Sequence, residues 1–273
     1  MSSPPLPRRR ARPPAASRRR LACASLFGLL ALSGCATVPP NAGQDPRDPF
    51  ERANRQVYAF NDAIDRAAVR PLAQAYVDYV PDPVRRCVDN AFSNLREPSN
   101  AVNNLLQGKP TDAVQSGLRL VINSTIGLAG CFDVMAGEGV TRRPEDFGQT
   151  LGVWGFGTGP YLVLPLLGPS SVRDTAGLSV ETVLDPNFYL QNPVAEYTLF
   201  GARIFNQRAG LLSADALLDT ALDPYLAVRE AFLQRRRSLL FDGLPPMELD
   251  PDMAPLGSED EGSSDPPKAA PAR

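Results

Sequence analysis

The sequence predicts a single all-α domain, because helix-start signals recur along it and extended β-type patterns do not. The Asp-Pro pairs at 48–49, 82–83 and 223–224 each place an acid at a helix N-cap and a proline at the first helical position. Apolar residues then recur every three or four positions, as on amphipathic helices. No long run alternates apolar and polar residues, so a sheet-based fold is not expected.

The first two predicted helices follow Asp48 and Asp82. Glu51 comes three residues after Asp48 and can complete a capping box. The apolar positions of the first helix recur at helical spacing: Phe50, Ala53, Val57, Phe60, Ile64 and Ala68. Those of the second form a broad apolar stripe: Val84, Cys87, Val88, Ala91, Phe92 and Leu95.

Proline and glycine divide the remaining helical segments. Pro98 breaks the pattern, a short piece ends at Gly108, and residues 110–125 resume it. The resumed stripe consists of Val114, Leu118, Val121 and Ile122. Further helices are expected over 170–184, 193–208, 213–221 and 224–240.

The segment 148–168 interrupts this helical pattern with six glycines and an apolar stretch, Tyr161 to Leu167, that Pro165 breaks. No strand precedes it and no Gly-Lys-Ser/Thr follows, so a nucleotide-binding loop is a poor interpretation. It is either a buried core loop or a flexible apolar hairpin that touches lipid or gates a cavity.

The N-terminus predicts a lipoprotein signal peptide over residues 1–34. Seven arginines and no acid fill the first twenty residues, and the short apolar run 21–32 ends at Ser33-Gly34-Cys35. The run is too short to span a membrane, which takes about 20 apolar residues. The exit resembles the bacterial lipobox, in which the cysteine thiol accepts a diacylglyceryl group. We therefore expect cleavage before Cys35 and a lipid anchor on it.

Two flanking segments complete the predicted organisation. Residues 35–47 read as a tether, and the residue after the lipidated cysteine, Ala36, is typical of lipoproteins sorted to the inner leaflet of the outer membrane. Residues 242–273 contain eight acids, two basic residues and few large apolar ones, so we expect a disordered acidic tail. The helical domain is then 48–241.

Composition argues against several classes of function. The chain has no histidine, which removes Ser-His-Asp and Cys-His catalysis and imidazole metal sites, and only two lysines, Lys109 and Lys268. Residues 35–241 contain 19 basic and 22 acidic residues, so no basic face for nucleic acid is expected. No catalytic residue, metal site or cofactor is predicted. Cys87 and Cys131 could form one disulfide in an oxidising compartment, or be two small buried apolar residues.

Many short motifs, in order from about Asp48 to Phe241, resemble one family, the MlaA (VacJ) outer-membrane lipoproteins. They are Asp48-Pro-Phe-Glu-Arg-Ala-Asn54, Tyr58-Ala-Phe-Asn61, Val69-Arg-Pro71, Tyr79-Val-Pro81, Asn94-Leu-Arg-Glu-Pro98, Leu106-Gln-Gly-Lys109, Asn123-Ser-Thr-Ile-Gly127, Phe147-Gly-Gln-Thr-Leu-Gly152, Gly157-Thr-Gly-Pro-Tyr161, Arg173-Asp174, Asp223-Pro-Tyr225 and Arg229-Glu230. Cys87 and Cys131 fall where small or apolar residues are expected in that family, so the resemblance does not imply a disulfide.

The resemblance implies a ring of helices in the inner leaflet of the outer membrane around an amphipathic channel. Such a protein removes misplaced phospholipids from the outer leaflet and passes them to a soluble periplasmic carrier, beside a trimeric porin and without chemical conversion. The family's hairpin falls on 155–168 here. This assigns a hinge role to Gly155, Gly157 and Gly159, and a lining or gating role to Tyr161, Leu162, Val163, Leu164, Leu166 and Leu167. The alternative from another class is a structural scaffold lipoprotein associated with porins.

Overall fold

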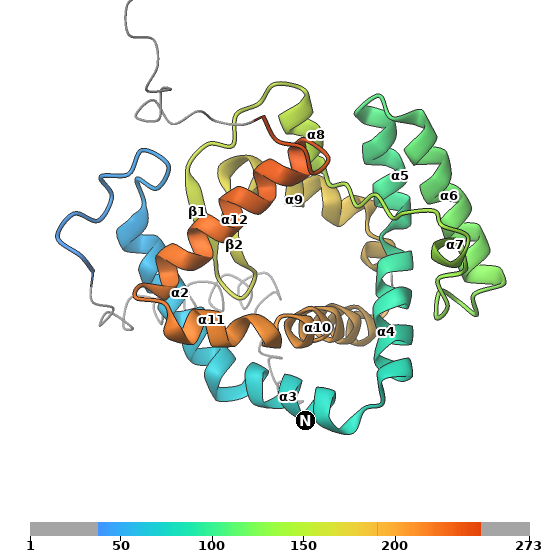
Figure 1. Ribbon diagram of the computed structural model, residues 1–273, viewed down its shortest axis with the longest axis horizontal. Coiled ribbons are helices and arrows are strands. Elements are labelled where there is room, and N and C mark those ends of the chain that lie inside the picture. Colours follow the sequence, from blue (N-terminus) through green and yellow to red (C-terminus); the bar gives the residue numbers. More distant parts are fainter. Residues whose placement is uncertain (1–37, 190, 247–273) are drawn as a thin grey trace, which may run out of the picture.

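The computed structural model describes residues 38–189 and 191–246. The signal segment 1–34, Cys35 and the tail from 247 onward therefore lie outside the described residues. Within the described part, helices follow one another around a ring, and the last helix, α12, returns to the first, α2 (Figure 1). The all-α prediction is confirmed.

The first half of the ring is built from helices only. A π-helical turn at Asp65–Val69 connects α2 to α3 without a break, and α4, α5 and α6 follow through tight turns. A short α7 precedes α8. The bounds are α2 Glu51–Ile64, α3 Arg70–Tyr79, α4 Asp82–Leu95, α5 Glu97–Leu106, α6 Pro110–Thr125, α7 Val134–Gly137 and α8 Phe147–Val153.

The second half begins with a small hairpin. Strands β1, Tyr161–Leu164, and β2, Gly168–Ser171, pair antiparallel with Tyr161 opposite Ser171 and Leu164 opposite Gly168. The chain then continues through α9 Val172–Leu184, η2 Pro186–Tyr189, α10 Pro193–Gly210, η3 Leu212–Ala214, α11 Asp215–Thr220 and α12 Pro224–Leu240. Helix α10 packs against α3 and α4 of the first half of the ring.

Helix ends set by local signals match the prediction. Helices α6 and α12 begin and end at the predicted residues, 110–125 and 224–240. The Asp223 carboxylate accepts from the N–H groups of Tyr225 and Leu226 at the start of α12. Helix α9 begins two residues later than predicted, because Ser171 ends β2 and caps the helix.

The predicted capping box at Asp48 is wrong. Helix α2 begins at Glu51 behind an N-cap, Phe50, that makes no side-chain cap bond. The Glu51 carboxylate accepts from the N–H of Gly43 instead, at 2.9 Å. Asp48 is fully buried, and its carboxylate bonds to side chains from other elements. At the second start, Asp82 likewise makes no cap bond but pairs with Arg85.

The amphipathic helices α5 and α6 present their apolar stripes outward. Leu105 and Val114 are 63% and 61% exposed, and the rest of this apolar outer face is also exposed: Val102, Leu106, Leu118, Val121, Ile126 and Leu128. The polar side chains of the two helices are buried instead: Ser99, Asn100, Asn103, Asn104, Ser116, Arg119 and Asn123. Their bonds reach the rest of the body, as Asn103 does to Glu181 of α9 and Asn123 to Asp133 before α7. This arrangement inverts that of a water-soluble helix pair, which buries its apolar stripe. None of the described helices combines the length and apolar character needed to cross a bilayer.

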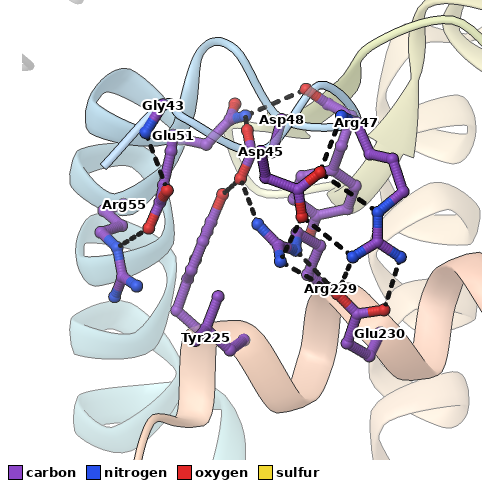
Figure 2. Close-up of polar contacts among 12 residues, drawn as sticks. Gly43, Asp45, Arg47, Asp48, Glu51, Arg55, Tyr225, Arg229 and Glu230 are labelled. Atoms are coloured by element: carbon purple, nitrogen blue, oxygen red, sulfur yellow. Dashed lines mark hydrogen bonds and ion pairs between the residues drawn. The ribbon is translucent and has the colours of Figure 1, made fainter. Parts of the chain in front are cut away.

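The ring is closed by a buried carboxylate that joins its two ends (Figure 2). Asp48 accepts from Asn54 of α2 at 2.8 Å, from Arg229 of α12 at 3.2 Å, and from the Tyr225 hydroxyl. Burial, together with the bond to Asp48, raises the pKa of Tyr225 and keeps its hydroxyl a donor. We call Asp48, Tyr225 and Arg229 the clasp.

Further ion pairs surround the clasp. Arg229 also bonds to Asp45 at 2.9 Å, and Arg47 bridges Asp45 and Glu230, each at 2.9 Å. Arg55 of α2 contacts Glu51 and Asp223, and its guanidinium lies 4.4 Å from the centre of the Tyr225 ring. Residues 45–47 of the predicted tether therefore contact the body.

The first residues of the predicted tail also contact the body. The Asp242 carboxylate pairs with Lys109 at 2.6 Å, and Arg237 donates to the carbonyl of Pro246 at 2.9 Å.

A disulfide joins Cys87 of α4 to Cys131, in the loop after α6, with their Cα atoms 4.1 Å apart. It closes a loop of 44 residues, and the Asn90 amide donates to the carbonyl of Cys131 beside it. The bond therefore ties α4 to the α6–α7 connection.

Replacing Asp48 with alanine should destabilise the ring by about 3–5 kcal/mol, because it leaves Arg229 buried without its inner partner. Urea unfolding of the purified chain in detergent measures this. Asp62→Ala, which removes a partly exposed partner of Arg66, is the control and should cost about 0–1 kcal/mol. Equal loss in the two variants would contradict a clasp role.

Removing the disulfide by the double substitution Cys87→Ser and Cys131→Ser should cost about 4 kcal/mol, the chain entropy of a loop of this size. Thiol labelling of the protein isolated from an oxidising compartment checks the bond itself. Two reactive thiols before reduction would refute it.

Candidate functional site

The hairpin is bound to the ring by two asparagines of α2. Asn54 donates to the carbonyl of Tyr161 at 3.0 Å and accepts from the N–H of Val163 at 2.9 Å. Asn61, two helical turns later, donates to the carbonyl of Leu164 at 2.9 Å and accepts from the N–H of Leu166 at 2.8 Å. These side chains replace the neighbouring strand that the free edge of β1 lacks.

Side chains of the hairpin alternate between two environments. Tyr161 and Val163 are buried and form a small core with Tyr225 of α12. Burial raises the pKa of Tyr161. Leu162 and Leu164 are half-buried, and the tip residues Leu166 and Leu167 are 59% and 48% exposed. Strand pleating therefore makes Tyr161 and Val163 the anchor of the hairpin and leaves its leucines free to contact other apolar groups.

Two of the three predicted hinge glycines need to be glycine. Gly155 and Gly159 have φ of +93° and +68°, a region that residues with a side chain rarely adopt. A Cβ at Gly159 would also lie 3.2 Å from the Cβ of Val172. Gly157 lies outside that region and has open space around it, so the conformational argument does not apply there.

A cavity of about 400 Å³ lies among α9, η2, α10, α12 and the hairpin. Its volume falls within the range of about 300–1,000 Å³ typical of ligand sites. Apolar side chains form part of its wall: Leu167, Leu178, Phe188, Tyr197, Phe200, Ile204 and Phe232. Charged side chains form another part: Arg96, Asp146, Asp174, Glu181, Asp185, Glu196, Arg203 and Arg236. We call it the amphipathic cavity.

Most charges of this cavity are paired within its wall. Arg236 contacts both Asp146, at 2.9 Å, and Asp174, at 2.8 Å, and Arg203 pairs with Asp185. Burial alone would raise the pKa of Asp146, but the hydrogen bond and charge of Arg236 hold it below its usual value.

A second cavity, of about 290 Å³, lies on the other side of the hairpin. Tyr161, Val163 and Gly168 line it, whereas Leu167 and Ser170 line the amphipathic cavity, and Pro169 lines both. The hairpin is thus the wall between the two cavities.

Several site residues were not predicted as such from the sequence. Asn54 and Asn61 end two of the recognised motifs, and their seven-residue spacing placed them on one helix face. Arg96 lies in the recognised motif Asn94-Leu-Arg-Glu-Pro98, but the motif does not indicate a cavity role. Arg203 carries no sequence signal, and the role of both depends on helices that meet only in the folded ring. No group of three or more acidic or cysteine side chains in the described segments is arranged to hold a metal ion.

The geometry defines a class of protein: a helical ring with an apolar outer face and a hairpin between two internal cavities. Residues 46–239 match the model of the MlaA lipoprotein family. The chain is 39% identical over 229 residues to the intermembrane phospholipid transport system lipoprotein MlaA of Escherichia coli K12, covering 81% of this chain and 90% of that one. It is 32% identical to the protein of that name from Haemophilus influenzae, over 80% and 90% of the two chains.

A solved structure, reported as the structural basis for maintenance of bacterial outer membrane lipid asymmetry, shares the fold. Its TM-score is 0.64 at 36% identity, and the match covers 71% of this chain and 98% of that one. The chain belongs to the MlaA lipoprotein family.

Gly159→Val should displace the hairpin, because valine disfavours the positive φ and meets Val172. Gly157→Val is the matched control, since it lies two residues away in open space. Hydrogen exchange at the amides of Val163 and Leu166 measures the effect. It should rise at least tenfold in the first variant only, the loss of about 1.4 kcal/mol of local stability. Equal exchange in both variants would contradict a special role for Gly159.

Proposed function

We propose that this protein moves phospholipids out of the outer membrane through its ring, as a component of a system that maintains lipid asymmetry. The observation that carries the proposal is the inverted polarity of the molecule: an apolar outer face on α5 and α6, and an internal cavity with both apolar and charged walls. A phospholipid needs apolar contact for its acyl chains and polar contact for its headgroup. The relatives' names, which specify intermembrane phospholipid transport, support the same function.

The proposal includes where the protein sits. The apolar outer face would lie among the acyl chains of the inner leaflet of the outer membrane, with the acylated Cys35 as a second attachment from the periplasmic side. A chain held by both the apolar outer face and the lipid anchor would keep its cavities next to the lipid that it receives.

The proposed route runs along the hairpin between the two cavities, with Leu162, Leu164, Leu166 and Leu167 as lining or gate. Tyr161 and Val163 would hold the hairpin in place, and Gly155 and Gly159 would let it swing. No bond is made or broken in this step, so the protein would act as a conduit and not as an enzyme. A soluble periplasmic carrier would receive the lipid, and a trimeric porin would hold the ring in the membrane.

A charge on the hairpin tip should block the route. Leu167→Asp places a carboxylate in the wall of the amphipathic cavity, where an unpaired charge among acyl chains is costly. Cells that depend on this variant should accumulate phospholipid in the outer leaflet and become sensitive to detergent. Leu167→Met, of similar volume and uncharged, is the control.

Protein abundance in both strains is measured alongside, so that loss of folding is not mistaken for loss of transport. A normal barrier in the Leu167→Asp strain, at normal protein abundance, would contradict the route and favour a porin-associated scaffold.

A further inference from the structure

Arg96 lies at the junction of α4 and α5, where the backbone holds it firmly. Its N–H donates to the carbonyl of Ser93 at 3.1 Å, and its carbonyl accepts from the N–H of Asn100 at 2.9 Å. The side chain is half-buried and lines the amphipathic cavity. The turn between the two helices therefore positions a guanidinium at the cavity wall.

In the described part of the chain, Arg96 differs from every other arginine that is buried or half-buried. The side chain of each of the others has a hydrogen bond or ion pair, and the side chain of Arg96 has none. The remaining arginines without a partner, such as Arg86, are exposed to solvent. A partly buried cation without a partner is costly, so this position favours an anion from outside the chain.

The neighbouring acidic side chains do not serve as the anionic partner of Arg96. Burial lowers the pKa of Arg96, and the positive charge of Arg203 lowers it further, against the pull of Glu181, Asp146 and Asp185. Those acids bond elsewhere in the site. Glu181 accepts from Ser99, Asn103 and the N–H of Phe147, Asp146 pairs with Arg236, and Asp185 pairs with Arg203.

The rest of the wall indicates the kind of anion. Phe188, Phe200 and Phe232 provide apolar contact in the same cavity. Glu196, on the first turn of α10, also lines it and has no partner among the described residues. With three arginines and five acids, the wall is negative overall, which suits a ligand whose own phosphate is balanced by a positive group.

We propose that Arg96 binds the phosphodiester of a phospholipid headgroup inside the amphipathic cavity, and that Glu196 and the surrounding acids favour zwitterionic, amine-bearing headgroups over anionic ones. The planar guanidinium can donate two parallel N–H bonds to phosphate oxygens. The apolar wall would contact the adjoining acyl chains. This inference rests on the proposed function and adds the headgroup class to it.

The test is the phospholipid that copurifies with the full chain in mild detergent, measured as lipid phosphorus per protein and by mass spectrometry. Arg96→Gln should lower occupancy at least tenfold, the loss expected for a charge-assisted contact. Arg96→Lys should retain part of the lipid occupancy, because lysine keeps the positive charge but lacks the two parallel N–H donors of the guanidinium. Arg86→Gln, an exposed arginine on α4, is the matched control and should bind as the unmodified protein does.

Selectivity is tested in mixed micelles of phosphatidylethanolamine and phosphatidylglycerol. The unmodified protein should be enriched in phosphatidylethanolamine, and Glu196→Gln should reduce that enrichment without lowering total occupancy. Equal binding of the two lipids by the unmodified protein would overturn the headgroup preference.

Two outcomes separate this inference from the function on which it rests. Unmodified occupancy in Arg96→Gln would overturn the inference alone, as would saturable binding of inorganic phosphate that Arg96→Gln abolishes while bound lipid stays constant. An unmodified protein that carries no phospholipid would overturn the proposed function as well.

Discussion

The buried carboxylate of Asp48 is the centre of the contacts that hold the two ends of the ring together. Tyr225 and Arg229 reach it from α12 (Figure 2), and Asn54 reaches it from α2. Asn54 also binds the hairpin through the backbone of Tyr161 and Val163. Ring closure and hairpin position therefore share one hydrogen-bond network. Asp48 and Arg229 are buried charges in this network, so removing either one leaves the other without its partner at a high cost.

The polar interior follows from the surroundings that the outer face indicates. In hydrocarbon, apolar side chains gain little by moving inward, and helices are held instead by packing and by hydrogen bonds between polar groups. The buried polar side of α5 fits this description, with Asn103 bonded to Glu181 of α9 and Asn104 to the carbonyl of Asn100 within α5. The same rule leaves the interior free to hold charged and apolar walls side by side, as the amphipathic cavity does.

The sequence was sufficient for features that depend on neighbouring residues. Helix α12 starts at Pro224 because the Asp223 side chain caps it, and α6 spans the predicted residues 110–125. Features that depend on contacts between residues far apart in the sequence could not be predicted. Asp48 read as a cap because its true partners, Tyr225 and Arg229, lie 177 and 181 residues away. Helical periodicity located the stripes of α5 and α6 but could not tell whether they face inward or outward. Arg96 belongs to a recognised motif, but its place in the cavity wall could not be predicted, since its lack of a side-chain partner exists only in the folded ring.

The central claim is that phospholipid occupies the interior of the ring. Photo-crosslinking tests it most directly, with a photoreactive phenylalanine analogue placed at Phe200 or Phe232 in the amphipathic cavity, and at Leu118 on the apolar outer face. The account predicts that light attaches a diacyl phospholipid at all three positions in native membranes. Lipid attached at Leu118 alone, with Phe200 and Phe232 unmodified, would contradict it.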